Sequence, residues 1–280
     1  MQEWALKSIH TLEWIDVENG HPYFGSYDGV LYSLGYGGIS IYPENKKGET
    51  YVVHENATII YGPAFGDNPY LKTLVLNDKM HIASFSSAML HNTNIESIEV
   101  PVENPYIKSK DGVVYTKDGK NLLFYPPAKK DKIFFVPDGV KEIGYNEHYY
   151  SFETCQYLEE LYIPSSVEIW SGQVWYSDSI KKVIFASESN LKTLDEFQFA
   201  FCTSLESICL PKSITNFRSG WGNQFYDCIN LTKLYIAQGN VIKIRVDFNN
   251  QLFFFVTLFQ RSVAFFVTLF QRNFVFFALK

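Results

Sequence analysis

The 280-residue sequence lacks most of the features that would mark it as an enzyme or a nucleic-acid-binding protein. It carries 24 lysines and arginines against 30 acidic residues, a formal charge of −6, so it has no overall basic excess for a nucleic-acid partner. The six histidines are scattered, and the motifs of zinc proteases, serine hydrolases and phosphate-binding loops are absent. We therefore expect no enzyme activity, no catalytic residues and no cofactor.

Long apolar runs are also scarce. The carboxyl-terminal octet FFVTLFQR, which begins at Phe254 and again at Phe265, is interrupted by Arg261 and Arg272. A membrane-spanning helix needs about 20 apolar residues. We interpret residues 247–280 as an apolar tail that arose by a short tandem duplication and packs on the last repeat or aggregates. Attachment of the tail to a membrane surface is the less favoured alternative.

A leucine-rich pattern recurs along residues 1–246. Apolar residues stand at i, i+3 and i+5, and the last two share one face of a strand. Units this short cannot bury their own apolar side, so they must stack as a solenoid. We predict a mainly β solenoid of about nine rungs with these inward-facing pairs: Ile15/Val17, Tyr51/Val53, Leu74/Leu76, Ile98/Val100, Phe134/Val136, Leu161/Ile163, Val183/Phe185, Ile208/Leu210 and Leu234/Ile236.

Two rungs are longer than the others and reveal a duplication within residues 12–143. Matching residues lie 83 positions apart, as in Asp28 and Asp111 or Tyr32 and Tyr115. Each copy carries the segment S-x-D-G-V-x-Y. In the second copy, apolar runs flank residues 117–120, which predicts an inserted β-hairpin there. In the first copy, glycines among residues 35–38 are expected to supply the positive φ angles of the corresponding turn.

These residues resemble the BspA-like leucine-rich repeats, a class of bacterial surface repeat. The resemblance covers about residues 6–236 and depends on CTSLESICLPKSI, CQYLEELYIPSSV and the paired segments HPYFGSYDGVLY and NPYIKSKDGVVYTKDGKNLLFYP. It implies a secreted or surface-exposed, non-catalytic solenoid that binds proteins, cells or polysaccharide. The family's I-G-x-x-A-F turn is kept at Ile143 and Gly144 but is replaced around residues 170–175.

The cysteines fit the repeat better than a metal site. No C-x-x-C pair and no paired histidines at ligand spacing occur. Cys155, Cys202 and Cys228 occupy the position at which leucine-rich repeats place Asn or Cys, and Asn68 and Asn92 are assigned there in earlier repeats. We expect buried structural thiols at this position and Cys209 pointing outward, with a Cys202–Cys228 disulfide as the alternative.

The residue between each inward pair should form an outward row, which reads Asp16, Val52, Val75, Glu99, Phe135, Tyr162, Ile184, Cys209 and Tyr235. Exposed apolar columns often mark contact surfaces. We therefore predict adhesin-like binding of a protein partner through Phe135, Tyr162, Ile184 and Tyr235. The alternative is that a terminal segment covers this face.

Two other functional readings stay open. Aromatic residues in the turns could stack on sugar rings in a glycan-binding or glycan-processing protein, or could pack in the core: Trp170, Trp175, Tyr176 and Trp221. Residues 1–10 do not resemble a secretory signal. Either Trp4, Leu6 and Ile9 cap the first rung, or a leader has been lost, and an intracellular scaffold is the third possibility.

Lysines gather between residues 108 and 132, where seven of them face three aspartates and leave a local charge of 7 − 3 = +4. The two readings are a contact for an anionic partner such as an acidic glycan, and a solvated hairpin that lysines protect from edge pairing.

Overall fold

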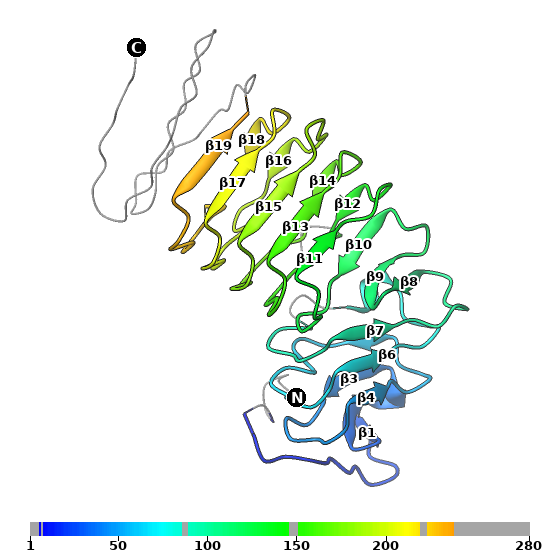
Figure 1. The fold of residues 1–280 in the computed structure, drawn as a ribbon. Coiled ribbons are helices and arrows are strands. Elements are labelled where there is room, and N and C mark those ends of the chain that lie inside the picture. The colour runs from blue at the N-terminus through cyan, green and yellow to red at the C-terminus, as the bar shows by residue number, and fades with distance from the viewer. Residues whose placement is uncertain (1–5, 7, 86–88, 146–150, 219–222, 238–280) are drawn as a thin grey trace, which may run out of the picture.

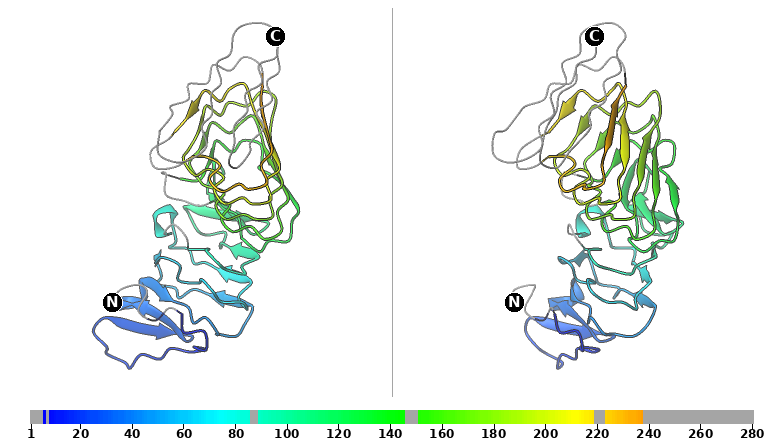
Figure 2. Two further views of the ribbon diagram at one scale, coloured as in Figure 1. Left: turned by 90° about the vertical axis from the view of Figure 1, so that its left-hand side faces the viewer. Right: turned by 60° about the vertical axis from the view of Figure 1, so that its left-hand side comes forward.

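The computed structural model describes residues 6, 8–85, 89–145, 151–218 and 223–237. In this part of the chain short strands stack as the rungs of a β-solenoid, with the first residues at one end and β19 at the other (Figures 1 and 2). The predicted tail, Trp4 and Trp221 lie outside the described residues.

One layer of the solenoid contains the predicted leucine-rich strands, paired in parallel in two separate sheets. The first sheet contains β4 (Thr50–Val52), β6 (Thr73–Val75) and β7 (Ser97–Glu99). The second contains β11 (Ile133–Phe135), β13 (Glu160–Ile163), β15 (Lys182–Phe185), β17 (Ser207–Leu210) and β19 (Lys233–Ile236). We call this layer the strand face.

The opposite layer begins with the two copies of the duplication. The first copy forms β1 (Phe24–Tyr27), β2 (Val30–Ser33), β3 (Gly38–Ile41) and β5 (Ile59–Ile60), with the 3₁₀ helix η1 (Leu34–Tyr36) between β2 and β3. The second copy forms β8 (Ile107–Lys110), β9 (Val113–Thr116), β10 (Asn121–Phe124) and β12 (Glu142–Ile143), 83 residues later in each case.

The rest of this layer comes from shorter elements. Strand β14 (Ile169–Trp170) extends the second copy's sheet, and β16 (Thr193–Leu194) pairs with β18 (Asn216–Phe217). A second 3₁₀ helix, η2 (Ile82–Ser84), stands between β6 and β7.

Alternation along each strand explains the core. First members of the predicted pairs, such as Leu74, Leu161 and Ile208, are at most 1% exposed, whereas the intervening residues point outward. The buried side chains form two clusters, one between residues 30 and 124 and one between residues 113 and 234. Eight of the nine predicted pairs have their first member in a strand, so the rung prediction is confirmed but for one.

The exception is the first rung. Ile15 and Val17 are only partly buried and lie in a segment without strand hydrogen bonding, although the Ile15 amide donates to the Gly29 carbonyl. No parallel strand precedes this segment among the described residues. The strand prediction is therefore wrong for this rung, because a strand needs a paired neighbour and the described residues supply none.

The inserted hairpins are present and contain one more turn than predicted. Strands β9 and β10 flank residues 117–120 as expected, and Asp111 and Gly112 form a second tight turn between β8 and β9. Both turn residues have positive φ, 52° and 80°, which suits a two-residue hairpin turn. In the first copy the positive φ angles between β2 and β3 belong to Gly35 and Tyr36 rather than to glycines alone.

The two sheets of the strand face do not join. Strand β7 is the last strand of its sheet and β11 the first of the next, and Figure 1 shows them running in different directions. The loops that precede them still meet, since the Ala128 amide donates to the Ile95 carbonyl at 2.9 Å. The solenoid therefore bends at the second hairpin, and we call this place the joint.

Candidate binding surfaces

The outward row of the second sheet brings the four predicted partner-contact residues together. Phe135 is 64% exposed and Tyr235 39%, while Tyr162 and Ile184 are partly exposed between them. Cys209 completes the row and is exposed, as expected. The strands place these side chains in one column because neighbouring strands pair in register, Phe135 with Tyr162, Tyr162 with Ile184 and Cys209 with Tyr235.

Aromatic stacking orders one end of this column. The rings of Phe135 and Tyr162 lie 4.4 Å apart between centroids and are 23° from parallel. The Tyr162 hydroxyl donates to the Glu160 carboxylate at 2.9 Å, which fixes the ring from its polar end. Stacked rings on a rigid sheet lose little conformational freedom when a partner binds, so this end is preorganised for contact.

Ion pairs run along one border of the column. Glu159 lies between Lys132 at 3.0 Å and Lys181 at 2.8 Å, and Glu160 pairs with Lys182 at 2.8 Å. Hydrogen bonds from Lys181 and Lys132 lower the pKa of Glu159 to about 2. The border charges are thus compensated by their neighbours, and the exposed apolar side chains remain the distinctive feature of this surface.

Most lysines of the 108–132 cluster are also engaged. Lys117 donates to the carbonyls of Val102 and Asn104, Lys130 pairs with Glu96 at 3.3 Å, and Lys129 pairs with Asp131 at 3.2 Å. The remaining pairs are Lys132 with Glu159 and Lys120 with Asp118. Lys108 and Lys110 lie on β8, the edge strand of its sheet. This placement matches the reading in which lysines protect a hairpin edge.

The turn aromatics divide into core and surface residues. Trp170 is 2% exposed and packs against Phe185 and Phe199, so its ring is not accessible to a sugar. This corrects its assignment as a glycan contact. Trp175 is partly exposed, Tyr176 is 40% exposed, and the two rings stack on each other.

Three further rings that the sequence reading missed complete a surface cluster: Phe197, Phe201 and Tyr226. The rings of Tyr176 and Phe201 are 4.3 Å apart and 6° from parallel. Both residues have positive φ, 53° and 59°, a conformation that bulky side chains rarely adopt. Equivalent rungs place Thr154 and Asp227 there, with φ of 51° and 55°. The signal in the sequence was an aromatic residue directly before the Cys or Ser position of the repeat.

That Cys position is structural. Cys155, Cys202 and Cys228 are buried and unbridged, and the thiols of the last two donate to the carbonyls of Val174 and Phe199, each at 2.9 Å. Burial raises the pKa of Cys155 to about 12. Asn68 is buried at the same position as predicted, but Asn92 is exposed and Thr93 takes its place.

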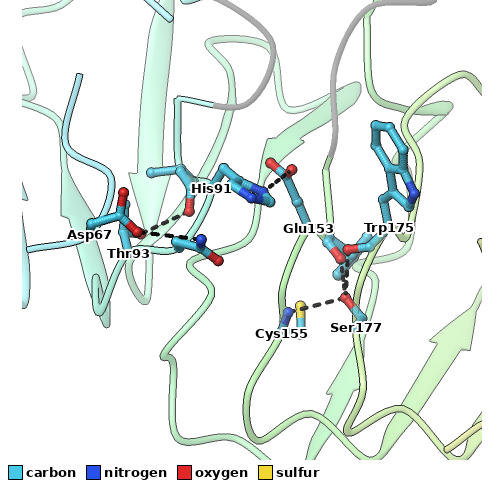
Figure 3. Close-up of polar contacts among 10 residues, drawn as sticks. Asp67, His91, Thr93, Glu153, Cys155, Trp175 and Ser177 are labelled. Atoms are coloured by element: carbon cyan, nitrogen blue, oxygen red, sulfur yellow. Dashed lines mark hydrogen bonds and ion pairs between the residues drawn. The ribbon is translucent and has the colours of Figure 1, made fainter. Parts of the chain in front are cut away.

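The joint carries an ion pair that links residues 62 positions apart. His91 Nδ1 lies 2.8 Å from the buried carboxylate of Glu153 (Figure 3). The hydrogen bond with Glu153 raises the pKa of the half-exposed His91 above its usual value. Figure 3 also shows Ser177 close to Cys155, whose backbone amide donates to the Ser177 hydroxyl. The pair is one of several contacts across the joint, with the Ala128–Ile95 hydrogen bond and the Lys130–Glu96 ion pair.

The described residues hold neither a cluster of metal-ligating side chains nor a membrane-spanning helix. They contain no group of three or more His, Cys, Asp or Glu side chains arranged to hold a metal ion. They also contain no helix of the length and hydropathy needed to cross a bilayer.

Stacked parallel rungs with a leucine-rich core define this molecule as a leucine-rich-repeat β-solenoid. The family model described as "BspA type Leucine rich repeat region" matches six copies over residues 42–110 and 124–252. The chain therefore belongs to the BspA-type leucine-rich-repeat family, as the sequence resemblance indicated.

Solved structures show the same fold at low identity. The pneumococcal vaccine antigen PcpA is 21% identical with a TM-score of 0.52, and the match covers 68% of this chain and 51% of that one. A leucine-rich cell surface protein from Faecalibacterium prausnitzii is 22% identical with a TM-score of 0.51, covering 66% and 53%. The chain thus spans about half the length of these structures. No curated protein matches it.

Proposed function

We propose that this protein is a non-catalytic, adhesin-like binding module of the cell surface that recognises a protein partner through the strand face. The observation that carries the proposal is the outward column of Phe135, Tyr162, Ile184 and Tyr235, held in register by parallel strands. Exposed aromatic and aliphatic side chains on a rigid surface are typical of protein interfaces. Membership of the repeat family and the surface origin of the Faecalibacterium structure support the location.

The test compares the strand face with an exposed apolar residue of the opposite layer. Full-length protein and the double variant Phe135→Ala/Tyr162→Ala are passed over a panel of immobilised extracellular proteins and polysaccharides by surface plasmon resonance. Binding to a protein should weaken at least tenfold, since aromatic contacts of this kind are worth about 2 kcal/mol each. Ile169→Ala is the matched control, because Ile169 is 54% exposed on the opposite layer. Equal effects of the two variants would reject the strand face.

A glycan-binding surface is the second candidate. The cluster around Tyr176 and Phe201 favours it, because it gathers stacked, solvent-accessible aromatic rings at one place on the surface. In the same panel, Tyr176→Ala should then abolish binding to a polysaccharide and leave protein binding unchanged. Trp175 should behave in the same way, whereas the buried Trp170 should affect only stability.

A further inference from the structure

The second sheet of the strand face begins with an open edge. The Glu160 amide donates to the Lys132 carbonyl and the Val136 amide donates to the Tyr162 carbonyl, both at 3.0 Å, so alternate residues of β11 face β13. Successive backbone groups point to opposite edges of a strand. The amides and carbonyls of Ile133 and Phe135 therefore point away from the sheet, and none of these four groups has a hydrogen-bond partner among the described residues.

The edge of the preceding sheet is closed in a way that β11 is not. On β7, the Ile98 amide donates to the Gly112 carbonyl and the Val100 amide to the Ser109 hydroxyl, each at 3.0 Å. The hairpin of β8 and β9 thus occupies the position where the next parallel strand would pair. Because the ladder stops there, β11 begins a new sheet without a neighbour.

The side chains at this edge do not protect it from pairing with another strand. Proteins usually protect strand edges with lysine, proline or a covering segment. Strand β8 has Lys108 and Lys110 on its edge, whereas β11 presents Ile133, 49% exposed, and Phe135, 64% exposed. An edge with unpaired backbone groups and apolar side chains is the kind of surface to which an extended peptide adds as a strand.

The same arrangement occurs 83 residues earlier. On β4, Glu49 and Val53 bond to the next strand, so the backbone groups of Thr50 and Val52 point away from it, and Val52 is 54% exposed. The duplication has therefore kept an open edge after each hairpin. A feature retained in both copies is less easily explained as an accident of one loop.

We propose that β11 binds an extended segment of the partner protein as an added strand, with apolar side chains of that segment alternating against Ile133 and Phe135. The inference rests on the proposed strand face, because Phe135 belongs to both. The strand face then supplies specificity and the edge supplies backbone hydrogen bonds.

Ile133→Pro tests the edge without removing the aromatic column. Proline deletes the one outward amide at position 133, and because that amide takes no part in the ladder, an edge strand tolerates the change. Ile133→Ala is the matched control, since it removes the same side chain and keeps the amide. Thermal melting should be similar for the two variants.

The probe is a synthetic peptide selected from a random short-peptide library displayed against the wild-type protein. Strand addition predicts at least tenfold weaker binding to Ile133→Pro than to Ile133→Ala. It also predicts that N-methylation of every second peptide residue abolishes binding when the methylated amides are those that face β11, and has no effect when they are those that face away. This readout does not depend on whether the proline variant folds.

Other outcomes separate the edge from the face. Peptides that lose affinity for Phe135→Ala/Tyr162→Ala but bind both Ile133 variants equally would overturn strand addition and leave the strand face intact. Peptides that bind every variant equally would overturn both. A concentration-dependent dimer abolished by Ile133→Pro would show that the edge pairs with a second copy of this chain, and would overturn the assignment to a foreign peptide.

Discussion

The two copies of the duplication make the same local hydrogen bonds but reach different structures. Ile15 and Ile98 both donate to the carbonyl of the hairpin glycine, and Val17 and Val100 both donate to a hairpin serine at 3.0 Å. Yet Ile98 lies in strand β7 and is fully buried, while Ile15 is partly exposed outside any strand. The difference is the preceding strand, since β6 pairs with β7 whereas no described residues pair as a strand with the segment around Ile15. In a solenoid, whether a segment forms a strand depends on pairing with the adjacent rung as much as on its own sequence.

The largest effect should come from removing equivalent isoleucines. Ile98→Ala leaves a cavity in a closed core and should lower the free energy of unfolding by about 3 kcal/mol, whereas Ile15→Ala should cost about 1 kcal/mol because its side chain already meets water. Urea unfolding curves of the two variants measure the difference. Equal losses would mean that the first rung is as well packed as the later ones.

Equivalent capping side chains give the next comparison. Asn104 donates to the carbonyls of Asn77 and Met80 in the preceding rung and accepts two backbone amides of its own turn. Its counterpart, His21, accepts two amides of its own turn at 3.1 and 3.2 Å and is exposed.

Removing each cap should therefore have unequal costs. Asn104→Ala should lower the free energy of unfolding by about 2 kcal/mol, because it removes the donor to the carbonyls of Asn77 and Met80. His21→Ala should lower it by about 0.5 kcal/mol. Asn104→Asp, which buries a carboxylate oxygen against these two carbonyls, should cost at least as much as Asn104→Ala in thermal melts. A mild Asn104→Ala would show that bonds between rungs add little.

The same contrast explains what the sequence could predict. Alternation and repeat spacing determine which residues turn inward, so pairs such as Leu161/Ile163 were found without coordinates. The missing strand at Ile15, the break between β7 and β11 and the exposure of Ile133 depend on which rungs pair. The contact of His91 with Glu153 joins residues far apart in the chain, and no local pattern encodes it.

The outward row was predicted because it follows from the inward one. Its burial by a terminal segment could not be judged from periodicity, and the terminal residues that could supply such a cover lie outside the described part of the chain. Trp170 was misplaced because an aromatic residue in a turn segment has no periodic signature that separates core from surface. Asn92 was one residue out of register, since Thr93 rather than an asparagine fills the buried position.

The hairpin glycines test the contact between hairpin and rung. Gly112 and Gly29 both have positive φ, 80° and 71°. A Cβ on Gly112 would lie 3.1 Å from the Ser97 Cα in β7, whereas a Cβ on Gly29 would meet the exposed ring of Trp14, which can turn away. We expect Gly112→Ala to cost about 2 kcal/mol and Gly29→Ala about 1 kcal/mol, the latter from backbone strain alone. Chemical denaturation would contradict this reading if Gly29→Ala were the more harmful change.

The smallest effect concerns a titratable contact that only the second copy has. His91 and Glu153 flank that copy, and the equivalent positions in the first copy carry Ser8 and Gly66, neither of which can form an ion pair. The pKa of His91 is raised in the folded protein, so its contribution to stability is complete below its unfolded pKa of about 6.5 and is lost as the pH rises through the folded value. Relative to His91→Gln, the wild type should lose less than about 1 kcal/mol between about pH 5 and about pH 9, because the imidazole is half exposed and solvent screens the pair. Melting temperatures of the wild type and His91→Gln at both pH values measure how the stability difference between the two proteins changes with pH. A wild type that gains stability over His91→Gln as the pH rises would show that neutral His91, rather than the ion pair, holds the joint.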